Sequence, residues 1–264
     1  MLKNPQASIL ISSYNKGNYL EQCIKSCLSQ TLKNIEVVLL DNHSNDKTNV
    51  VLKKFSKKIK ILKKKRISKF PALNQIDLLN KAFKVSKGSI IYLLDADDYF
   101  NKSKIKNING IFKTKSKVSV IFDIPTIKSK NSYKKFKIKN KKTKNIWPTI
   151  IPTSSIAMRR SFFSQYLKSD NLRKFNLLEI DFRINVLAFN ILKNFLILDK
   201  NFTYYRVTKN SIMDNTRKYS KKWWLKRKQA HEYMFKLFKK SKVDYKNLDF
   251  SVTNIFNYLL KIVK

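Results

Sequence analysis

The sequence predicts an α/β protein built on a mostly parallel sheet. In the first hundred residues, short apolar runs of strand length alternate with segments of helical periodicity. This alternation is typical of right-handed crossovers between parallel strands. The run Ile90–Leu94 is apolar or aromatic throughout, as expected of a strand covered on both faces. The chain has 264 residues, 43% of them hydrophobic, which suffices for one large domain or one domain with an appendage.

The expected elements of this first part can be placed in order. The strands are expected at Ser8–Ser12, Ile35–Leu40, Ile59–Leu62 and Ser89–Leu94. The helices between them are expected at Tyr19–Gln30, Asp46–Phe55 and Ala72–Val85. The first helix carries an apolar stripe formed by Leu20, Cys23, Ile24, Cys27 and Leu28. Asp46 is well placed to cap the second helix.

The remainder of the chain is less regular. We expect a helix at Lys102–Phe112, a strand at Val118–Phe122, an exposed Lys-rich hairpin or mobile loop at Lys128–Lys144, a buried helix at Leu177–Leu192 and a strand at Phe195–Tyr205. The chain is basic, aromatic and helical from Arg217 on. These patterns predict one domain over residues 1–214 and a helical C-terminal extension over residues 215–264.

The formal net charge of +40 suggests an anionic partner, but most of the basic residues are Lys, which recognises nucleic acid less specifically than Arg does. Only eight of the 57 Lys and Arg residues are Arg, the residue that base recognition and bidentate phosphate contacts favour. We rank three explanations for the lysines. Compositional bias of an AT-rich genome comes first, contact with an anionic membrane second and nucleic-acid binding third. We therefore expect no specific nucleic-acid partner.

The sequence also bears on location and redox state. No apolar run approaches the roughly 18–20 residues needed to cross a bilayer, and the N-terminus shows no secretory signal. We expect a cytoplasmic protein, with peripheral contact at the inner face of the membrane as an open possibility. Cys23 and Cys27 are expected to be reduced thiols on the buried face of a helix. Trp223 and Trp224, set among Lys and Arg, suit either an interfacial helix or one packed on the domain.

Carboxylates gather where the expected strands end. Asp95, Asp97 and Asp98 directly follow the strand at Ser89–Leu94, and Asp41 follows the strand at Ile35–Leu40. The carboxyl ends of parallel strands meet at one edge of the sheet, where ligands bind. Clustered acids repel one another unless a cation holds them, and hard divalent cations prefer carboxylate oxygen. The pattern predicts a site for a metal ion and a phosphate-bearing substrate.

Two segments carry a family resemblance. ASILISSYNKGNYLEQCIKSCLSQTLKNIEVVLLDNHSNDKT, from Ala7, and GSIIYLLDADDYF, from Gly88, resemble the N-terminal block and the Asp-x-Asp motif of family 2 glycosyltransferases. The resemblance covers residues 7–100 strongly and 150–206 loosely. It implies the GT-A fold, a Rossmann-like, mostly parallel sheet flanked by helices. It also implies an inverting transferase that moves a sugar from a nucleotide-sugar donor, a UDP-sugar being favoured, to a glycan or lipid-linked acceptor in cell-envelope polysaccharide biosynthesis.

The resemblance also implies roles for the donor-side residues. Those that would bind the donor nucleotide are Ser13, Tyr14, Asn15, Asp41, Asn74 and Asp95. Among them, Asp41 would accept a hydrogen bond from a base N–H. Asp97 would be a direct ligand of Mg2+ or Mn2+, Asp95 would hold ribose or a metal-bound water, and Asp98 would orient either. The chain departs from the family pattern at Leu73, which replaces an Arg, and at His43, which replaces a Gly.

The catalytic base is expected in the segment LLEIDFRIN, at Asp181 or Glu179. Two positions on one helix differ by about 200° of rotation, so both side chains are not expected to face one substrate. Arg183 follows Glu179 at the spacing of a helix ion pair. Position relative to Tyr204 favours Asp181 as the family's base, with Glu179 as its competitor.

Two other classes of function remain as alternatives. A sugar nucleotidyltransferase shares a related sheet but needs a Gly-rich phosphate loop, and the chain has three Gly, none of them clustered. A non-enzymatic nucleic-acid-binding protein would bind any polyanion in a salt-sensitive way and would have no need of the acids.

Overall fold

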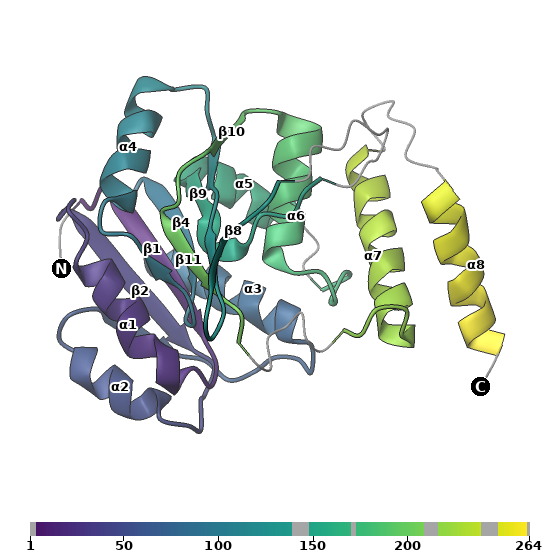
Figure 1. Cartoon of the computed structure of the whole chain (residues 1–264), viewed down its shortest axis with the longest axis horizontal. Helices are drawn as coiled ribbons and strands as arrows, with labels where there is room; N and C mark the ends of the chain where they lie inside the picture. Colours follow the sequence, from purple (N-terminus) through teal and green to yellow (C-terminus); the bar gives the residue numbers. More distant parts are fainter. Residues whose placement is uncertain (1–3, 139–147, 170–172, 209–215, 239–247, 263–264) are drawn as a thin grey trace.

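The computed structural model describes residues 4–138, 148–169, 173–208, 216–238 and 248–262. A seven-stranded sheet has the strand order β10-β6-β9-β4-β1-β2-β3 (Figure 1). Its strands are β1 (Ala7–Ser13), β2 (Ile35–Asp41), β3 (Lys60–Lys63), β4 (Ile90–Asp95), β6 (Val120–Asp123), β9 (Ile156–Arg159) and β10 (Phe195–Leu198). A second sheet has the order β5-β11-β7-β8, with β5 (Tyr99–Phe100), β7 (Thr126–Lys128), β8 (Tyr133–Lys135) and β11 (Thr203–Arg206).

Eight α-helices, together with two short helical segments, occupy the described part of the chain. They are α1 (Gly17–Leu28), α2 (Thr48–Phe55), α3 (Pro71–Val85), α4 (Lys104–Thr114), α5 (Arg160–Ser169), α6 (Ile180–Val186), α7 (Lys221–Phe238) and α8 (Leu248–Ile262). The short segments are the 3-10 turn η1 (Thr153–Ser155) and the π-helix η2 (Leu187–Leu192), which continues α6. The helices and strands predicted in the first hundred residues are confirmed, with boundaries shifted by one or two residues.

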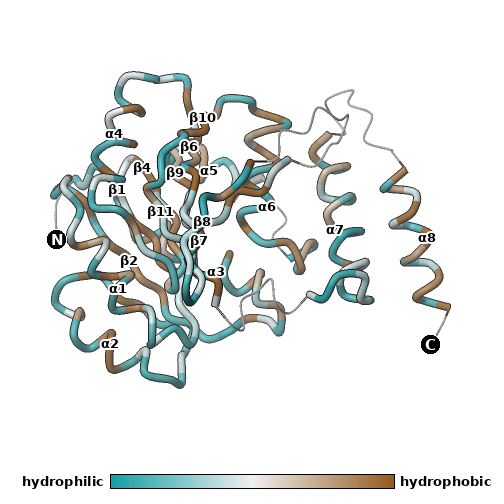
Figure 2. The backbone as a smooth tube through the Cα atoms, in the orientation of Figure 1, coloured by the Kyte–Doolittle hydropathy of each residue, from teal (hydrophilic) through white to brown (hydrophobic). Residues whose placement is uncertain are grey.

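The large sheet is mostly parallel and covered on both faces, as predicted. Strand β1 pairs in parallel with β2 and β4, whereas β9 runs antiparallel between β4 and β6. Alternate residues of β1 face opposite layers: Ile9 and Ile11 pack with α1, α2 and α4, and Leu10 packs with α3, α5 and α6. Figure 2 shows the apolar residues concentrated along these strands. The free thiols of Cys23 and Cys27 are buried in the first layer, as expected.

The turns after β1 and β2 are locked together by polar contacts. Asp46 accepts hydrogen bonds from the backbone N–H groups of Gly17 (3.0 Å) and Thr48 (2.9 Å), the first residues of α1 and α2. A Cβ on Gly17 would lie 2.6 Å from the Thr48 nitrogen, so only glycine permits this approach. His43 adopts a left-handed φ of 56°, which explains why the family pattern has Gly there.

The segment predicted as one strand at Phe195–Tyr205 is two strands in different sheets. Strand β10 pairs with β6 in the large sheet, and β11 pairs with β5 and β7 in the small one. The polar residues between them, Asp199, Lys200 and Asn201, allow the chain to leave the first sheet. This change of sheet brings β11 beside the acids that follow β4. The predicted Lys-rich hairpin exists as β7 and β8, and its part beyond residue 138 lies outside the described residues.

The C-terminal helices lie to the right in Figure 1, where α7 packs against the rest of the fold and α8 packs against α7. Helix α7 buries Ala230, Tyr233 and Met234 in a cluster with residues that flank or belong to α6. The ring of Trp224 stacks on Phe256 of α8 at 4.3 Å and is buried, because α7 and α8 enclose it. Within the described residues, no helix combines the length and apolarity that a membrane crossing requires.

Candidate functional site

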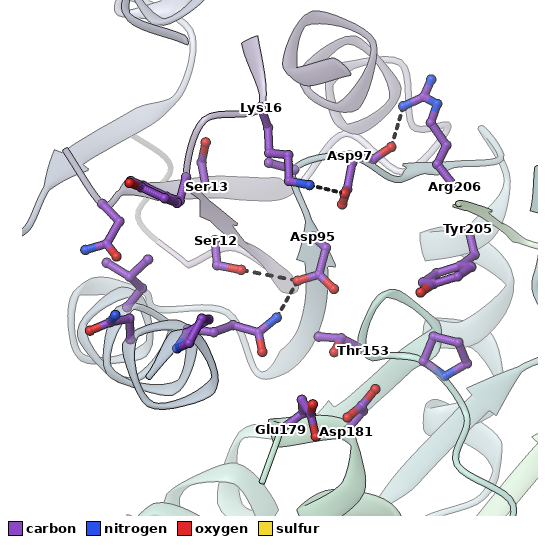
Figure 3. A pocket seen from close by; sticks show the side chains of 18 of the residues that line it. Ser12, Ser13, Lys16, Asp95, Asp97, Thr153, Glu179, Asp181, Tyr205 and Arg206 are labelled. Carbon is purple, nitrogen blue, oxygen red and sulfur yellow. Dashed lines mark hydrogen bonds and ion pairs between the residues drawn. The ribbon is translucent and has the colours of Figure 1, made fainter. Parts of the chain in front are cut away.

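A cleft of about 460 Å3 opens where β1 and β4 end (Figure 3). Its walls come from the β1 and β2 ends, the start of α3, the β4 end, η1, the start of α6 and the end of β11. The lining residues are Ser12, Ser13, Tyr14, Lys16, Asn42, Arg66, Pro71, Asn74, Gln75, Leu78, Asp95, Ala96, Asp97, Pro152, Thr153, Glu179, Asp181, Tyr205 and Arg206.

Asp95, the last residue of β4, occupies the middle of the cleft. Its Oδ1 accepts hydrogen bonds from Gln75 Nε2 (2.7 Å) and Ser12 Oγ (3.3 Å). Burial raises the pKa of Asp95 to about 6, and the nearby charge of Asp97 adds to the rise. The carboxyl group is therefore poised to gain from a neighbouring cation, whose charge would lower its pKa again.

Asp97 is held by a cation from the end of β1. Its Oδ2 lies 2.6 Å from Lys16 Nζ and accepts a hydrogen bond from Thr208 Oγ1 at 2.9 Å. The guanidinium of Arg206 donates to the backbone carbonyl of Asp97. Both partners of the ion pair keep some exposure, 20% for the Lys16 side chain and 12% for Asp97. The pair thus has access to the cleft and can exchange partners with an incoming ligand.

The third acid, Asp98, turns away from the cleft. Its oxygens accept hydrogen bonds from Ser154 Oγ (2.6 Å) and from the backbone N–H of Arg206 (2.8 Å). Burial and the charges of Asp97 and Asp95 raise the pKa of Asp98 well above its ordinary value. Asp98 therefore joins the β4 end to η1 and β11. This placement does not suit the metal-orienting role expected for it, because both oxygens are already engaged.

Four of the six residues predicted to bind the donor nucleotide line the cleft, namely Ser13, Tyr14, Asn74 and Asp95, and the other two support it. The buried Ser13 Oγ has no hydrogen-bond partner within the described residues. Asn15, with a left-handed φ of 51°, instead accepts a hydrogen bond from the N–H of Asn45. Asp41 is fully buried and accepts two hydrogen bonds from Ser44, so its carboxylate fixes the turn after β2.

The start of α3 supplies a third part of this wall. Asn74 lines the cleft while its Oδ1 accepts hydrogen bonds from the N–H groups of Ile67 and Ser68, which shapes the loop before α3. That loop brings Arg66 to the cleft, with its guanidinium 4.9 Å from the centre of the Tyr14 ring. Leu73 is buried. Arg66 therefore offers a cation to this wall although the family's Arg is missing at position 73.

Glu179 and Asp181 lie side by side on the opposite wall (Figure 3). The prediction that only one of them could face a substrate is wrong, because Glu179 precedes α6 as its N-cap in an extended conformation (φ −67°, ψ 158°). The expected pairing of Glu179 with Arg183 is also wrong. Glu179 Oε1 lies 2.5 Å from Lys226 Nζ, and Arg183 is buried and donates to the carbonyls of Phe175 and Leu178.

Asp181 has the properties of a proton acceptor at neutral pH. Burial, first, and the charge of Glu179 together raise its pKa to about 7, while Lys226 acts in the opposite direction. Its Oδ1 accepts a hydrogen bond from the backbone N–H of Phe182 at 2.7 Å. A group with a pKa near the working pH is both available as a base and strong enough to act as one.

The cations of the site were not predicted from the sequence. Lys16 directly follows the predicted nucleotide-binding residues Ser13, Tyr14 and Asn15. The need to neutralise clustered acids was a signal that could have identified it. Arg206 was not expected at the site, because its approach to Asp97 depends on β11 joining the second sheet. No sequence signal connects Lys226 with Glu179, since the two lie far apart in the chain.

The cleft can accommodate a divalent cation only with help from a ligand. Asp95 and Asp97 are the two carboxylates available, and no group of three or more His, Cys, Asp or Glu side chains at metal-binding distances occurs among the described residues. Mg2+ is commonly held by one or two carboxylates together with substrate phosphates. The donor set therefore fits a cation that arrives with a diphosphate, provided that Lys16 yields Asp97.

Comparison with solved structures shows the same fold. Staphylococcus aureus TarS (residues 1–349), in complex with UDP-GlcNAc, superposes with a TM-score of 0.64 at 15% identity, over 96% of this chain and 70% of that one. The mannosyltransferase PcManGT of Pyrobaculum calidifontis, in complex with GDP-Man and Mn2+, gives 0.57 at 14% identity, over 97% and 70%. Likeness at this level of identity establishes the GT-A fold.

Comparison of sequences establishes the family. An uncharacterised glycosyltransferase of Nostoc sp. is 29% identical over 76% of this chain and 64% of its own length. The glucosyltransferase WfaP of Escherichia coli, named for transfer from UDP-Glc to GlcNAc-diphosphoundecaprenol, is 37% identical over 38% of each chain. The chain thus spans less than two thirds of these relatives. The sequence model of the family "Glycosyl transferase family 2" matches residues 8–168, and the chain belongs to that family.

Proposed function

We propose that the protein is a metal-dependent, inverting glycosyltransferase that uses a nucleotide-sugar donor. The observation that carries the proposal is the pair of facing walls: Asp95 and Asp97 on one side of a single cleft and Asp181 on the other. Such an arrangement suits a diphosphate at the first wall and an acceptor hydroxyl at the second.

The acceptor side supplies the base. Asp181 takes the proton of an acceptor hydroxyl as that oxygen forms a bond to the anomeric carbon. The bond from this carbon to the diphosphate breaks, and the nucleoside diphosphate leaves with the electron pair. Attack from the face opposite the leaving group inverts the anomeric centre. The raised pKa of Asp181, about 7, favours this proton transfer at neutral pH.

The donor side binds and neutralises the diphosphate. Mg2+ or Mn2+, held by Asp97 and Asp95, supplies Lewis-acid stabilisation of the leaving group when it is bound. Lys16, Arg66 and Arg206 line the same wall, so their charges favour the phosphates. Ser13, Tyr14 and Asn74 are placed to contact the base and ribose.

The relatives support the choice of substrates. WfaP is named for transfer from UDP-Glc, TarS is in complex with UDP-GlcNAc, and PcManGT is in complex with GDP-Man and Mn2+. A UDP-sugar is therefore the favoured donor here. WfaP acts on a diphosphoundecaprenol-linked sugar. A glycan or lipid-linked acceptor of a cell-envelope polysaccharide is the acceptor class that we propose.

A lipid-linked acceptor would bring the protein to an anionic membrane, and α8 offers the surface for it. The exposed residues Ile255, Tyr258, Leu259 and Ile262 follow helical spacing and form one apolar stripe. The chain's net charge of +40 complements anionic lipid. Of the tryptophan pair that suggested a membrane-facing helix in the sequence, Trp224 is buried between α7 and α8, so we place the lipid contact on α8.

Nucleotide binding provides the first test. The thermal midpoint Tm of the intact protein is measured with UDP, GDP, CDP and ADP, each with and without Mn2+. A nucleotide at a hundredfold excess over its Kd stabilises the fold by about 2.7 kcal/mol, which raises Tm by roughly 5–10 °C. We expect the largest rise with UDP and Mn2+ together.

Asp97→Ala should abolish both the Mn2+-dependent rise in Tm and sugar transfer while the protein stays folded, because the Asp97 carboxylate serves the cleft rather than the core. The matched control is Asp199→Ala, which removes the same group from the exposed surface, where it pairs with Lys135. Unchanged Mn2+-dependent binding and transfer in folded Asp97→Ala would overturn the metal assignment. The same rise with every nucleotide would overturn the preference for UDP.

A further inference from the structure

Helix α7 brings a cation to the catalytic wall. Lys226 extends from α7 to Glu179, and both side chains are largely buried, with 20% and 10% of their areas exposed. Glu179 lies beside Asp181 in the cleft (Figure 3). Within the described part of the chain, the basic group that acts on this pair of acids therefore comes from a helix that begins about 40 residues later.

We propose that Lys226 is a positioning residue of the catalytic site: it neutralises Glu179 and thereby sets the pH range in which Asp181 can accept a proton. This inference rests on the proposed function, because it assigns the base to Asp181. It goes beyond that function by making α7 part of the catalytic apparatus. The C-terminal helix would then be required for turnover at neutral pH, and not only for stability.

The charges around Asp181 support this role. The charged side chains that act on it are Glu179 beside it, Asp95 across the cleft and Lys226 from α7, and Asp181 in turn acts on the phenol of Tyr205 from β11. Glu179 and Asp95 carry negative charge, and each makes ionisation of Asp181 harder. Lys226 is the charged side chain among these that favours ionisation, and the backbone N–H of Phe182 acts in the same direction. Without Lys226, Glu179 would act on Asp181 with its full charge.

The contacts of α7 hold Lys226 in register. Gln229, one turn from Lys226, accepts a hydrogen bond from the N–H of Leu177 (3.0 Å) and donates to Asn176 Oδ1 (3.0 Å). Met234 and Tyr233 are buried in a cluster with Phe175 and Leu178. The same helix therefore fixes both the segment that carries Glu179 and the ammonium that neutralises it. This geometry is that of a built site and not of a chance surface ion pair.

The test is the pH profile of transfer by the intact protein, measured as kcat against pH. In Lys226→Met, Glu179 is uncompensated, the pKa of Asp181 rises, and the acid limb should move to higher pH by roughly one unit. In Glu179→Gln, the negative neighbour is gone while Lys226 stays, so the acid limb should move to lower pH. The double variant should return toward the wild-type profile, since both charges are removed.

Two control variants separate charge from packing. Lys226→Arg keeps the charge and should keep the wild-type acid limb. Lys228→Met removes a Lys of the same helix that faces Glu232 at 4.0 Å, and it should leave the profile unchanged. If Lys226→Met does not fold, the double variant and Glu179→Gln still decide the question by the direction of their shifts.

The outcomes distinguish this inference from the proposed function. An unmoved acid limb in both single variants, with Asp181→Asn inactive, would overturn the role of Lys226 and leave the base assignment intact. Normal turnover by Asp181→Asn, with Glu179→Gln inactive, would overturn the base assignment itself. Opposite shifts in the two single variants would support the inference.

Discussion

The two walls of the cleft solve the same electrostatic problem with cations from different parts of the chain. On the donor wall, Asp97 is neutralised by Lys16, which lies three residues past the end of β1 in the same βαβ block. On the acceptor wall, Glu179 is neutralised by Lys226, from a helix outside the matched family segment. Carboxylates that share a cleft need such partners, because burial and mutual repulsion would otherwise protonate them.

This difference in the origin of the cations indicates that the acceptor wall can vary more readily than the donor wall. The donor wall is assembled from consecutive strand ends, so its geometry follows from the parallel sheet itself. The acceptor wall depends on how later helices pack, so a change in α7 can alter the base without disturbing nucleotide binding. We therefore expect variants of the two walls to separate cleanly into loss of binding and loss of turnover.

The largest effect expected on the acceptor wall is that of Asp181→Asn. The amide keeps the shape of the side chain but cannot accept the proton, and loss of a general base costs on the order of 10²–10⁴ in rate. Binding of UDP with Mn2+ should be unchanged, because Asp181 lies on the wall opposite Asp97. Single-turnover transfer and calorimetric titration of the same preparation check both halves. Weakened nucleotide binding would show that the two walls are not independent.

A second prediction concerns a buried pair that contacts η1, one of the elements that line the cleft. Lys104 Nζ is 2.8 Å from Asp123 Oδ1, both side chains are fully buried, and the same ammonium donates to the carbonyl of Ser154 (2.7 Å). Ser154 in turn holds Asp98 and the N–H of Asp95. Lys104→Met should lower the free energy of unfolding by about 3–5 kcal/mol, because it leaves Asp123 buried and unpaired. Urea unfolding measures the loss.

The controls for this pair are a surface pair and a double variant. Lys135→Met breaks the exposed pair with Asp199 and should cost less than about 1 kcal/mol. Lys104→Met combined with Asp123→Leu removes both charges and should recover much of the stability. If the double variant is no more stable than Lys104→Met alone, then the contacts to Ser154, and not the buried charge of Asp123, explain the cost.

The third prediction is that Asp181→Asn stabilises the fold as it destroys activity. The pKa of Asp181 is about 7 in the native state against an ordinary 3.8. Between these values the native state holds a proton that the unfolded state has released, so stability falls as pH rises from about 4 to 7. The Asn variant lacks this penalty. Its advantage in Tm should therefore be near zero at pH 4, grow to pH 7 and stay constant above. An advantage independent of pH would exclude the ionisation of Asp181 as its cause.

The same contrast explains what the sequence could predict. The donor half was accessible because hydrophobic periodicity and the acids after Leu94 are local signals, and parallel order brings strand ends together. The acceptor half could not be predicted, because three of its features depend on tertiary packing. Glu179 is extended and not helical, β10 and β11 belong to different sheets, and Lys226 is brought to Glu179 by the packing of α7. Helical spacing does not predict the direction of the Glu179 side chain, because Glu179 caps the helix and is not part of it.

The smallest expected effect lies furthest from the cleft, on α8. If its apolar stripe rests on anionic lipid, Ile255→Ser with Leu259→Ser should weaken binding to phosphatidylserine vesicles by roughly ten- to a hundredfold. The estimate assumes that the bilayer buries the exposed half of each side chain, since complete burial of one contributes about 1.5–3 kcal/mol. Turnover with a water-soluble acceptor should be unaffected, because neither residue lines the cleft. Both side chains are exposed, so Tm should change little.

The matched control for α8 is Val50→Ser, which removes an equally exposed apolar side chain from α2, at the opposite end of the molecule (Figure 1). Deleting residues 220–264 would be a poorer test, since it also removes Lys226 and uncovers the cluster around Phe175. Co-sedimentation at two salt concentrations separates the apolar contribution from the electrostatic one, because only the latter is screened. If the serine variant binds vesicles as the wild type does, and salt alone releases both, then the lysines and not α8 make the contact.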